Sequence, residues 1–174
     1  MSLKAEKMKK VLVALVTAIT VSGAVAAPAD VAANEWLSTP PTLSSAAARR
    51  LLAQAIEIGD KRGYRLCLAI TDSSGNLLDF DRHDGAHPGC VEAAIAKAKS
   101  AASNGVDTER LLDLARDYNP GIGAIPGIIP AVAGVALLYQ GKVIGGIGVA
   151  GGPNDKAEAD FAAELQSIVD EWLR

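Results

Sequence analysis

The sequence has few aromatic residues, histidines and cysteines. It contains two Trp, three Tyr and two Phe among 174 residues, so its core must consist mainly of Ala, Val, Leu and Ile. The only cysteines, Cys67 and Cys90, allow one disulfide at most. The two histidines, His83 and His87, give little support for nucleophilic catalysis, because a catalytic triad needs a histidine beside the nucleophile and a carboxylate to orient it.

A long apolar segment is also missing. The apolar run from Val11 to about Ala26 follows four lysines and ends in Ala-Val-Ala. It is shorter than the ~20 residues that a membrane-spanning helix needs, so we expect no stable membrane anchor. The pattern predicts a secretory signal peptide at residues 1–26, and therefore a periplasmic or secreted protein.

The chain has no excess of positive charge. Removal of residues 1–26 takes away four lysines and one glutamate, which leaves 13 basic and 19 acidic side chains and a net charge of −6. A nucleic-acid partner is not expected, because little would drive counterion release from a phosphate backbone. Residues 27–41 are small, polar and proline-terminated and predict a flexible N-terminal tether. Residues 42–174 suit one domain.

Hydrophobic periodicity predicts the order helix, hairpin, helices, hairpin, helix. Hairpins make neighbouring strands antiparallel, so the domain is expected to be α+β with a mostly antiparallel sheet. The expected helices follow Leu43, Pro88, Val106 and Asn154. The expected strands cover residues 64–72, 76–82, 135–139 and 142–152, with the last two joined at Gln140 and Gly141.

Two segments of the domain need separate interpretation. In the helix after Pro88, one face carries Val91, Ala94, Ile95, Ala98 and Ala101, and Lys97 and Lys99 lie off this face. Residues 119–130 contain three prolines and three glycines, which prevents a regular helix and predicts an apolar loop.

A glycine-rich motif, GIGVAG at residues 146–151, matches G-x-G-x-x-G between a strand and a helix. That helix is the last element of the chain, so no second parallel strand completes a dinucleotide-binding unit. The glycines more simply allow another backbone, a helix or a flat ligand to approach the strand. They also expose the first amides of the last helix, where a carboxylate or phosphate could dock.

The segment RHDGAHPGC at residues 82–90 contains both histidines and Cys90. One hypothesis is an ordinary solvated loop, and the other is a metal or haem contact made by His83 and His87. Asp79 and Asp81 share one face of the preceding strand, which is more often simply a solvated face. A disulfide between Cys67 and Cys90 and a pair of buried thiols are equally compatible with the sequence.

Several segments together resemble the GlcG/HbpS family of haem-binding and corrinoid-associated proteins. They are LSSAAARRLLAQAIEIGDKRGYRLCLAITDSSGNLLDFDRHDGA, AAIAKAKSAA, AIPG and GKVIGGIGVAGG, in this order. The resemblance runs from about Leu43 to the C-terminus. It implies a profilin-like sandwich, an antiparallel sheet with helices on both faces, and assembly into a symmetric homo-oligomer, often an octamer.

The same resemblance implies positions for a cofactor. The family's haem-binding members place a threonine at the iron in a K-A-x-T-A stretch, which residues 97–101 match with Ser100 at the threonine position. His83 and His87 depart from the family pattern and are candidate iron ligands, because imidazole binds haem iron well. Lys97 or Lys99 could pair with a propionate. Residues 119–130, Ile122, Ile125 and Ile128 among them, would cover the porphyrin or else close the core.

The sequence therefore leads to one main hypothesis and two others. The main hypothesis is an exported protein that binds haem, for sequestration or sensing of haem or iron, without turnover of its own. The alternative is a small-molecule-binding accessory protein or an enzyme of oxidative or corrinoid metabolism. A structural oligomer without a ligand is the third.

Overall fold

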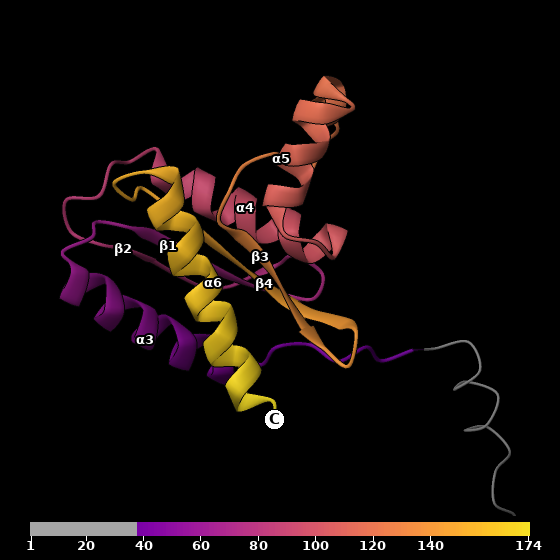
Figure 1. Cartoon of the computed structure of the whole chain (residues 1–174). Coiled ribbons are helices and arrows are strands. Elements are labelled where there is room, and N and C mark those ends of the chain that lie inside the picture. Colours follow the sequence, from indigo (N-terminus) through magenta and orange to yellow (C-terminus); the bar gives the residue numbers. More distant parts are fainter. Residues whose placement is uncertain (1–37) are drawn as a thin grey trace, which may run out of the picture. The chain divides into compact units, whose positions relative to one another are not determined.

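The computed structural model describes residues 38–174 (Figure 1). The predicted signal peptide, residues 1–26, and most of the predicted tether lie outside the described residues. Among the residues that are described, no helix is both long enough and apolar enough to cross a membrane.

Four antiparallel strands form the sheet, in the order β2-β1-β4-β3. The strands are β1 (Cys67–Asp72), β2 (Leu77–Arg82), β3 (Gly134–Tyr139) and β4 (Lys142–Ala150). Both predicted hairpins are present, and the central pair joins them, with Ile70 opposite Ile147. The α+β class predicted from the sequence is confirmed.

Helices cover both faces of this sheet (Figure 1). One face packs against α3 (Ser45–Arg62) and α6 (Asp155–Trp172), and the other packs against α4 (Cys90–Asn104). Helix α5 (Thr108–Asp117) follows α4 and extends away from the sheet. The sandwich with helices on both faces is therefore confirmed as well.

Local sequence signals set the bounds of the helices. Ser44 caps α3 by accepting a hydrogen bond from the Ala47 amide at 3.2 Å, and Gly63 ends it in the left-handed conformation. Asn154 caps α6 in the same way, through the amide of Ala157 at 2.9 Å. These short-range interactions explain why the helix limits were readable from sequence.

The two faces of the sheet have cores of different character. Large side chains fill the side of α3 and α6, among them Leu51, Leu68, Ile147, Phe161 and Leu165. The side of α4 is lined by small residues, among them Cys67, Ala69, Ala94, Ala98 and Ala150. Small residues on both surfaces let α4 lie close to the strands.

Glycines of the G-x-G-x-x-G motif make this close approach possible. A Cβ atom on Gly148 would overlap the carbonyl oxygen of Ala94, and one on Gly146 would overlap that of Ala98. Since β4 pairs antiparallel with both its neighbours, the motif is no part of a dinucleotide-binding unit. The interpretation that another backbone approaches the strand is confirmed.

The segment predicted as an apolar loop contains one short regular piece. Residues Pro120–Ala124 form a 3-10 helix, η1, with proline at its first position. Ile122 is buried, Ile128 is half-buried and Ile125 is exposed. The segment therefore packs against α5, buries Ile122 and leaves the apolar side chain of Ile125 on the surface.

Candidate functional site

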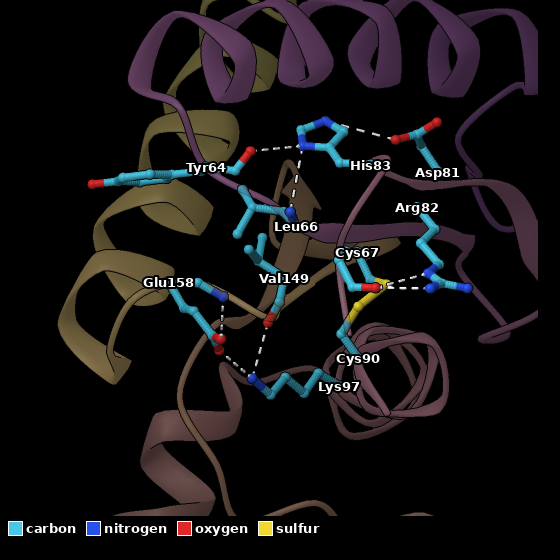
Figure 2. Close-up of a disulfide and its surroundings, with 12 residues drawn as sticks. Tyr64, Leu66, Cys67, Asp81, Arg82, His83, Cys90, Lys97, Val149 and Glu158 are labelled. Atoms are coloured by element: carbon cyan, nitrogen blue, oxygen red, sulfur yellow. Dashed lines mark hydrogen bonds and ion pairs between the residues drawn. A yellow bond between two sulfur atoms is a disulfide. The ribbon is translucent and has the colours of Figure 1, made fainter. Parts of the chain in front are cut away.

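A disulfide joins β1 to the start of α4 (Figure 2). It connects Cys67 and Cys90, whose Cα atoms lie 5.5 Å apart. The sequence was compatible with a disulfide and with a pair of buried thiols, and the structure contains the disulfide. The bridge closes the loop that contains His83 and His87 and fixes where α4 begins.

His83 lies on the opposite side of the sheet from this bridge, beneath α3 (Figure 2). Its residue surface is only 6% exposed. Its Nδ1 atom lies 3.1 Å from the carbonyl oxygen of Tyr64 and 3.3 Å from the amide nitrogen of Leu66. Its Nε2 atom lies 3.6 Å from Oδ2 of Asp81. The backbone thus holds one side of the imidazole ring, and the other side faces a carboxylate.

A hollow of about 390 Å³ lies beside this imidazole. It is lined by Ile56, Asp60, Arg65, Asp81, Arg82, His83 and Asp84. Asp81 belongs to the pair of strand carboxylates interpreted as a solvated face, but its Oδ2 atom is buried. The Asp81 side chain as a whole is 30% exposed, so it is partly solvated while its Oδ2 atom is turned toward His83 at the rim of the hollow.

His87 and Lys99 are exposed. His87 precedes α4, and its carbonyl oxygen accepts the hydrogen bond of the Cys90 amide. His83 and His87 therefore differ in surroundings, one packed under α3 and the other at the surface. Within residues 38–174, no group of three or more His, Cys, Asp or Glu side chains is arranged to hold a metal ion.

Lys97 is buried, although the helical pattern placed it off the packed face. Its Nζ atom donates to Oε2 of Glu158 at 2.6 Å and to the carbonyl oxygen of Val149 at 2.9 Å (Figure 2). Glu158 Oε1 accepts the amide of Gly152 at 2.9 Å. The protein's own Glu158 thus binds the Gly152 amide just before the last helix, and Lys97 is already paired.

Ser100 is fully buried under the segment that follows η1. Its Oγ atom accepts a hydrogen bond from the Ile129 amide at 3.0 Å, and the side chain of Asn104 donates to the Ser100 carbonyl oxygen at 2.8 Å. Residues 125–130 therefore lie over the position that the resemblance gives to the iron ligand.

A second hollow, of about 460 Å³, lies along α5. It is lined by Val106, Arg110, Leu111, Asp113, Leu114 and Tyr118. Tyr118 is 82% exposed, and Ile125 in the next segment is 51% exposed. Arg110 and Leu114 are one turn apart on α5, and Tyr118 is the residue that follows the helix. The hollow therefore combines apolar side chains with one guanidinium, one phenol and the carboxylate of Asp113.

The sequence contains residues that point to both hollows, but hydrophobic periodicity alone did not identify them. Arg110, Leu114 and Tyr118 recur every four residues, beyond the positions that the core needs. Asp81 and His83 are two residues apart in an extended segment, which places them on one face. Gly59, inside α3, faces the ring of His83. An interior helix glycine is unfavourable in itself and therefore points to a close neighbour.

An antiparallel four-stranded sheet with two helices on one face and an alanine-rich helix on the other defines a profilin-like α+β domain. A family model described as "Haem degrading protein HbpS-like" matches residues 43–166. The chain belongs to this HbpS-like family, as the resemblance predicted.

Individual relatives agree with this assignment. Protein GlcG of Escherichia coli strain K12 is 26% identical over 113 residues, which cover 65% of this chain and 84% of GlcG. A crystal structure of a double mutant of Streptomyces reticuli HbpS has 29% identity and a TM-score of 0.72, and the match covers 77% of this chain and 91% of that one. A complex of PduOC with haem shares the fold at 24% identity and a TM-score of 0.65, over 72% and 94% of the two chains.

Proposed function

We propose that this protein binds haem, in the hollow along α5. The proposal is supported by the HbpS-like family model over residues 43–166 and by the fold that the chain shares with PduOC, a protein solved with haem. The α5 hollow is the structural feature that carries it, because its lining combines apolar side chains for the ring with Arg110 for a propionate, beside the single carboxylate of Asp113.

The residues of the α5 hollow fit haem. Leu111, Leu114 and Val106 offer an apolar surface to the ring, and Arg110 offers a guanidinium for a propionate. The volume of about 460 Å³ lies within the range of ligand pockets in proteins, about 300–1,000 Å³. The phenol of Tyr118 is a known type of haem-iron ligand. Bound haem would supply an iron centre, and this chain would supply its orientation.

Ser100 is a different candidate ligand, carried over from the family resemblance. Its hydroxyl group is covered by residues 125–130, so an iron would reach it only after these residues move. Among the other predicted contacts, Lys99 and His87 are exposed, whereas Lys97 is paired with Glu158 and His83 lines the hollow beneath α3. We therefore place the haem with Tyr118 and Arg110, and the experiment below separates this arrangement from ligation by Ser100.

We also propose export, assembly and a binding role without turnover. The signal-peptide pattern of residues 1–26 supports a periplasmic or secreted location, and the Cys67–Cys90 disulfide suits an oxidising compartment. The exposed side chains of Ile125, Leu138 and Tyr139 support a homo-oligomer, because a second copy would cover them. Storage or sensing of haem requires binding but no catalytic step.

Haem degradation is the second candidate function, since the family model is described by that activity. A haem-degrading enzyme would be an enzyme of oxidative metabolism, which is one of the alternatives that the sequence left open. Haem-loaded protein mixed with ascorbate under air would lose its Soret band and release iron if this candidate is correct. A stable Soret band under these conditions would support binding without turnover.

Titration of the purified protein with haemin tests haem binding. We expect a sharp Soret band that saturates at a fixed ratio of haem to protein. Arg110→Ala and Leu114→Asp should each weaken binding about tenfold or more, because one removes a charge-assisted contact and the other the apolar surface. Leu77→Asp is the matched control, since Leu77 is an exposed leucine on β2 and does not line the α5 hollow.

The spectrum identifies the ligand. Tyr118→Phe should remove the absorption features of iron–phenolate ligation, whereas Ser100→Ala and His87→Ala should leave them unchanged. If only Ser100→Ala alters the spectrum, the haem lies under residues 125–130 instead. Binding that never saturates, or that none of these variants alters, would contradict the proposal.

A further inference from the structure

The hollow beneath α3 contains two buried polar atoms that have no hydrogen-bond partner within residues 38–174. They are Nε2 of His83 and Oδ2 of Asp81, and they face each other at 3.6 Å. Buried polar atoms are nearly always paired, so two unpaired atoms side by side call for a common partner. We propose that His83 and Asp81 bind a divalent transition-metal ion, at a site that goes beyond haem binding along α5.

The orientation of the imidazole suits a metal ligand. Nδ1 of His83 makes its shortest contact, 3.1 Å, with the Tyr64 carbonyl oxygen, which can only accept a hydrogen bond. The Leu66 amide donates to the same nitrogen at 3.3 Å, so the two contacts favour opposite tautomers; with the proton on Nδ1, Nε2 presents a lone pair toward Asp81. Histidine ligands of metals commonly have this arrangement, in which a backbone carbonyl accepts the other ring N–H and fixes the tautomer.

The separation of the two atoms distinguishes a metal ion from a direct hydrogen bond. A hydrogen bond from nitrogen to oxygen spans about 2.7–3.2 Å, which is shorter than the 3.6 Å observed. Two ligands at about 2.1 Å from one tetrahedral ion lie roughly 3.4 Å apart. The observed spacing is closer to that of two ligands of one ion.

The other charged groups of the hollow favour a cation. Arg82 donates from Nε and Nη2 to the Ala86 carbonyl oxygen at 3.1 and 2.8 Å, so it is held away from Asp81. Arg65 pairs with Asp60 at 3.8 Å. The exposed carboxylate of Asp84 also lines the hollow. Its negative charge favours a cation in the hollow, and water would complete the coordination.

The donor types narrow the choice of ion. Imidazole nitrogen suits zinc, iron, copper and nickel, whereas calcium and magnesium prefer oxygen ligands alone. One nitrogen and one carboxylate oxygen therefore favour a divalent ion such as Zn²⁺ or Fe²⁺. Because the protein supplies two ligands, the ion would stay accessible to water and exchangeable.

Gly59 keeps the imidazole in place. A Cβ atom at this position would lie 2.6 Å from Cε1 of His83, so any other residue would displace the ring. The ring lies between α3 and the backbone of residues 64–66, which fixes the direction of Nε2 before any ion arrives. Gly59→Ala is therefore expected to weaken metal binding while both ligands are retained.

Titration of the purified full chain with Co²⁺, and competition by Zn²⁺, tests the site. We expect visible absorption bands of Co²⁺ that saturate at about one ion per chain and disappear on addition of Zn²⁺. His83→Gln and Asp81→Asn should each weaken binding about tenfold or more, as expected for the loss of one ligand. His87→Ala is the matched control and should leave the titration unchanged, because His87 is the chain's exposed histidine.

Folding and protonation are followed in the same samples. Asp81→Asn keeps the size of the side chain and is expected to retain the circular dichroism spectrum and melting temperature of the parent protein, which separates ligand loss from unfolding. Nitrogen NMR of the imidazole should show unprotonated Nε2 at neutral pH and a shift of this nitrogen on addition of Zn²⁺.

Three results would overturn the site. They are the absence of saturable Co²⁺ binding, binding that neither ligand variant weakens, and a protonated Nε2 that Zn²⁺ does not alter. The last would mean that a proton, and not a metal ion, links the pair. Haemin titration of Asp81→Asn keeps this outcome separate from the proposed function, since haem binding along α5 should persist in this variant.

Discussion

Lys97 Nζ lies 2.6 Å from Oε2 of Glu158, and both side chains are buried between α4 and the start of α6. The pair connects segments that are 61 residues apart and also holds the backbone, through the Val149 carbonyl oxygen and the Gly152 amide. It therefore fixes the end of β4 and the beginning of α6 against α4.

Removal of one partner should be strongly destabilising. Lys97→Met leaves the Glu158 carboxylate buried without its cation, and an uncompensated buried charge costs about 3–5 kcal/mol. Urea unfolding at neutral pH measures the loss. The double variant Lys97→Met/Glu158→Gln should lose less than the sum of the two single variants, because it leaves no lone charge.

An exposed pair of the same length provides the control. Lys156 Nζ lies 2.6 Å from Oδ2 of Asp160 on the surface of α6. Surface ion pairs contribute about 0–1 kcal/mol, so Lys156→Met should change the unfolding free energy little. Equal losses at Lys97 and Lys156 would contradict a special role for the buried pair.

The glycines of β4 lead to a second prediction. A Cβ atom on Gly148 would overlap the backbone of Ala94 and lie 2.6 Å from the Ala98 amide nitrogen. Backbone cannot move aside as a flexible side chain can, so Gly148→Ala should push α4 off the sheet and cost about 3 kcal/mol or more. Gly89→Ala is the control, since a Cβ there meets no described atom within 4 Å. Thermal unfolding of both variants checks the difference.

Much of the fold could be predicted because its signals are local. Ser44 and Gly63 mark the ends of α3 through caps that involve only neighbouring residues. The hairpin turns and the alternation of the strands are equally local. The sequence also predicted that another backbone approaches Gly146 and Gly148, because these glycines lie in a strand and no second parallel strand follows to form a dinucleotide-binding unit.

The site could not be predicted in the same way, because its contacts are distant in sequence. Helical spacing placed Lys97 off the packed face, and no residue near Lys97 in the sequence indicates that Glu158 is its partner. His83 follows β2 in a loop rich in polar residues. Its burial depends on Gly59, which lies in helix α3. Ser100 matched a family position, but the covering residues 125–130 became visible only in the fold.

The disulfide gives a third prediction. Cys67 and Cys90 are 23 residues apart, and closing a loop of this length in the unfolded chain stabilises a protein by about 3 kcal/mol in the chain-entropy model. The variant Cys67→Ala/Cys90→Ala should lose about this amount in urea unfolding, and reduction of the parent protein should have a similar effect. Alkylation of the unfolded, unreduced protein should modify no cysteine; two modified thiols would show that the bridge is absent.

The turn between β1 and β2 predicts a dependence of stability on pH. Partial burial raises the pKa of Asp72, but hydrogen bonds from the Asn76 side chain and from the backbone amides of Asn76, Ser74 and Gly75 outweigh this effect, so the pKa is lowered from 3.8. A lowered pKa in the folded state means that the ionised carboxylate stabilises the fold. This contribution is complete well above pH 3.8 and is lost as the pH falls through the lowered pKa.

Asp72→Ala should therefore destabilise the protein at neutral pH by about 1 kcal/mol, as expected for lost hydrogen bonds in a partly exposed turn. The difference in urea midpoint between the variant and the parent protein should shrink as the pH falls below about 4, because the parent loses the same interaction by protonation. Asp170→Ala, on the exposed side of α6, is the control and should show no such convergence. A difference at Asp72 that stays constant down to acidic pH would mean that the ionised carboxylate does not stabilise the turn.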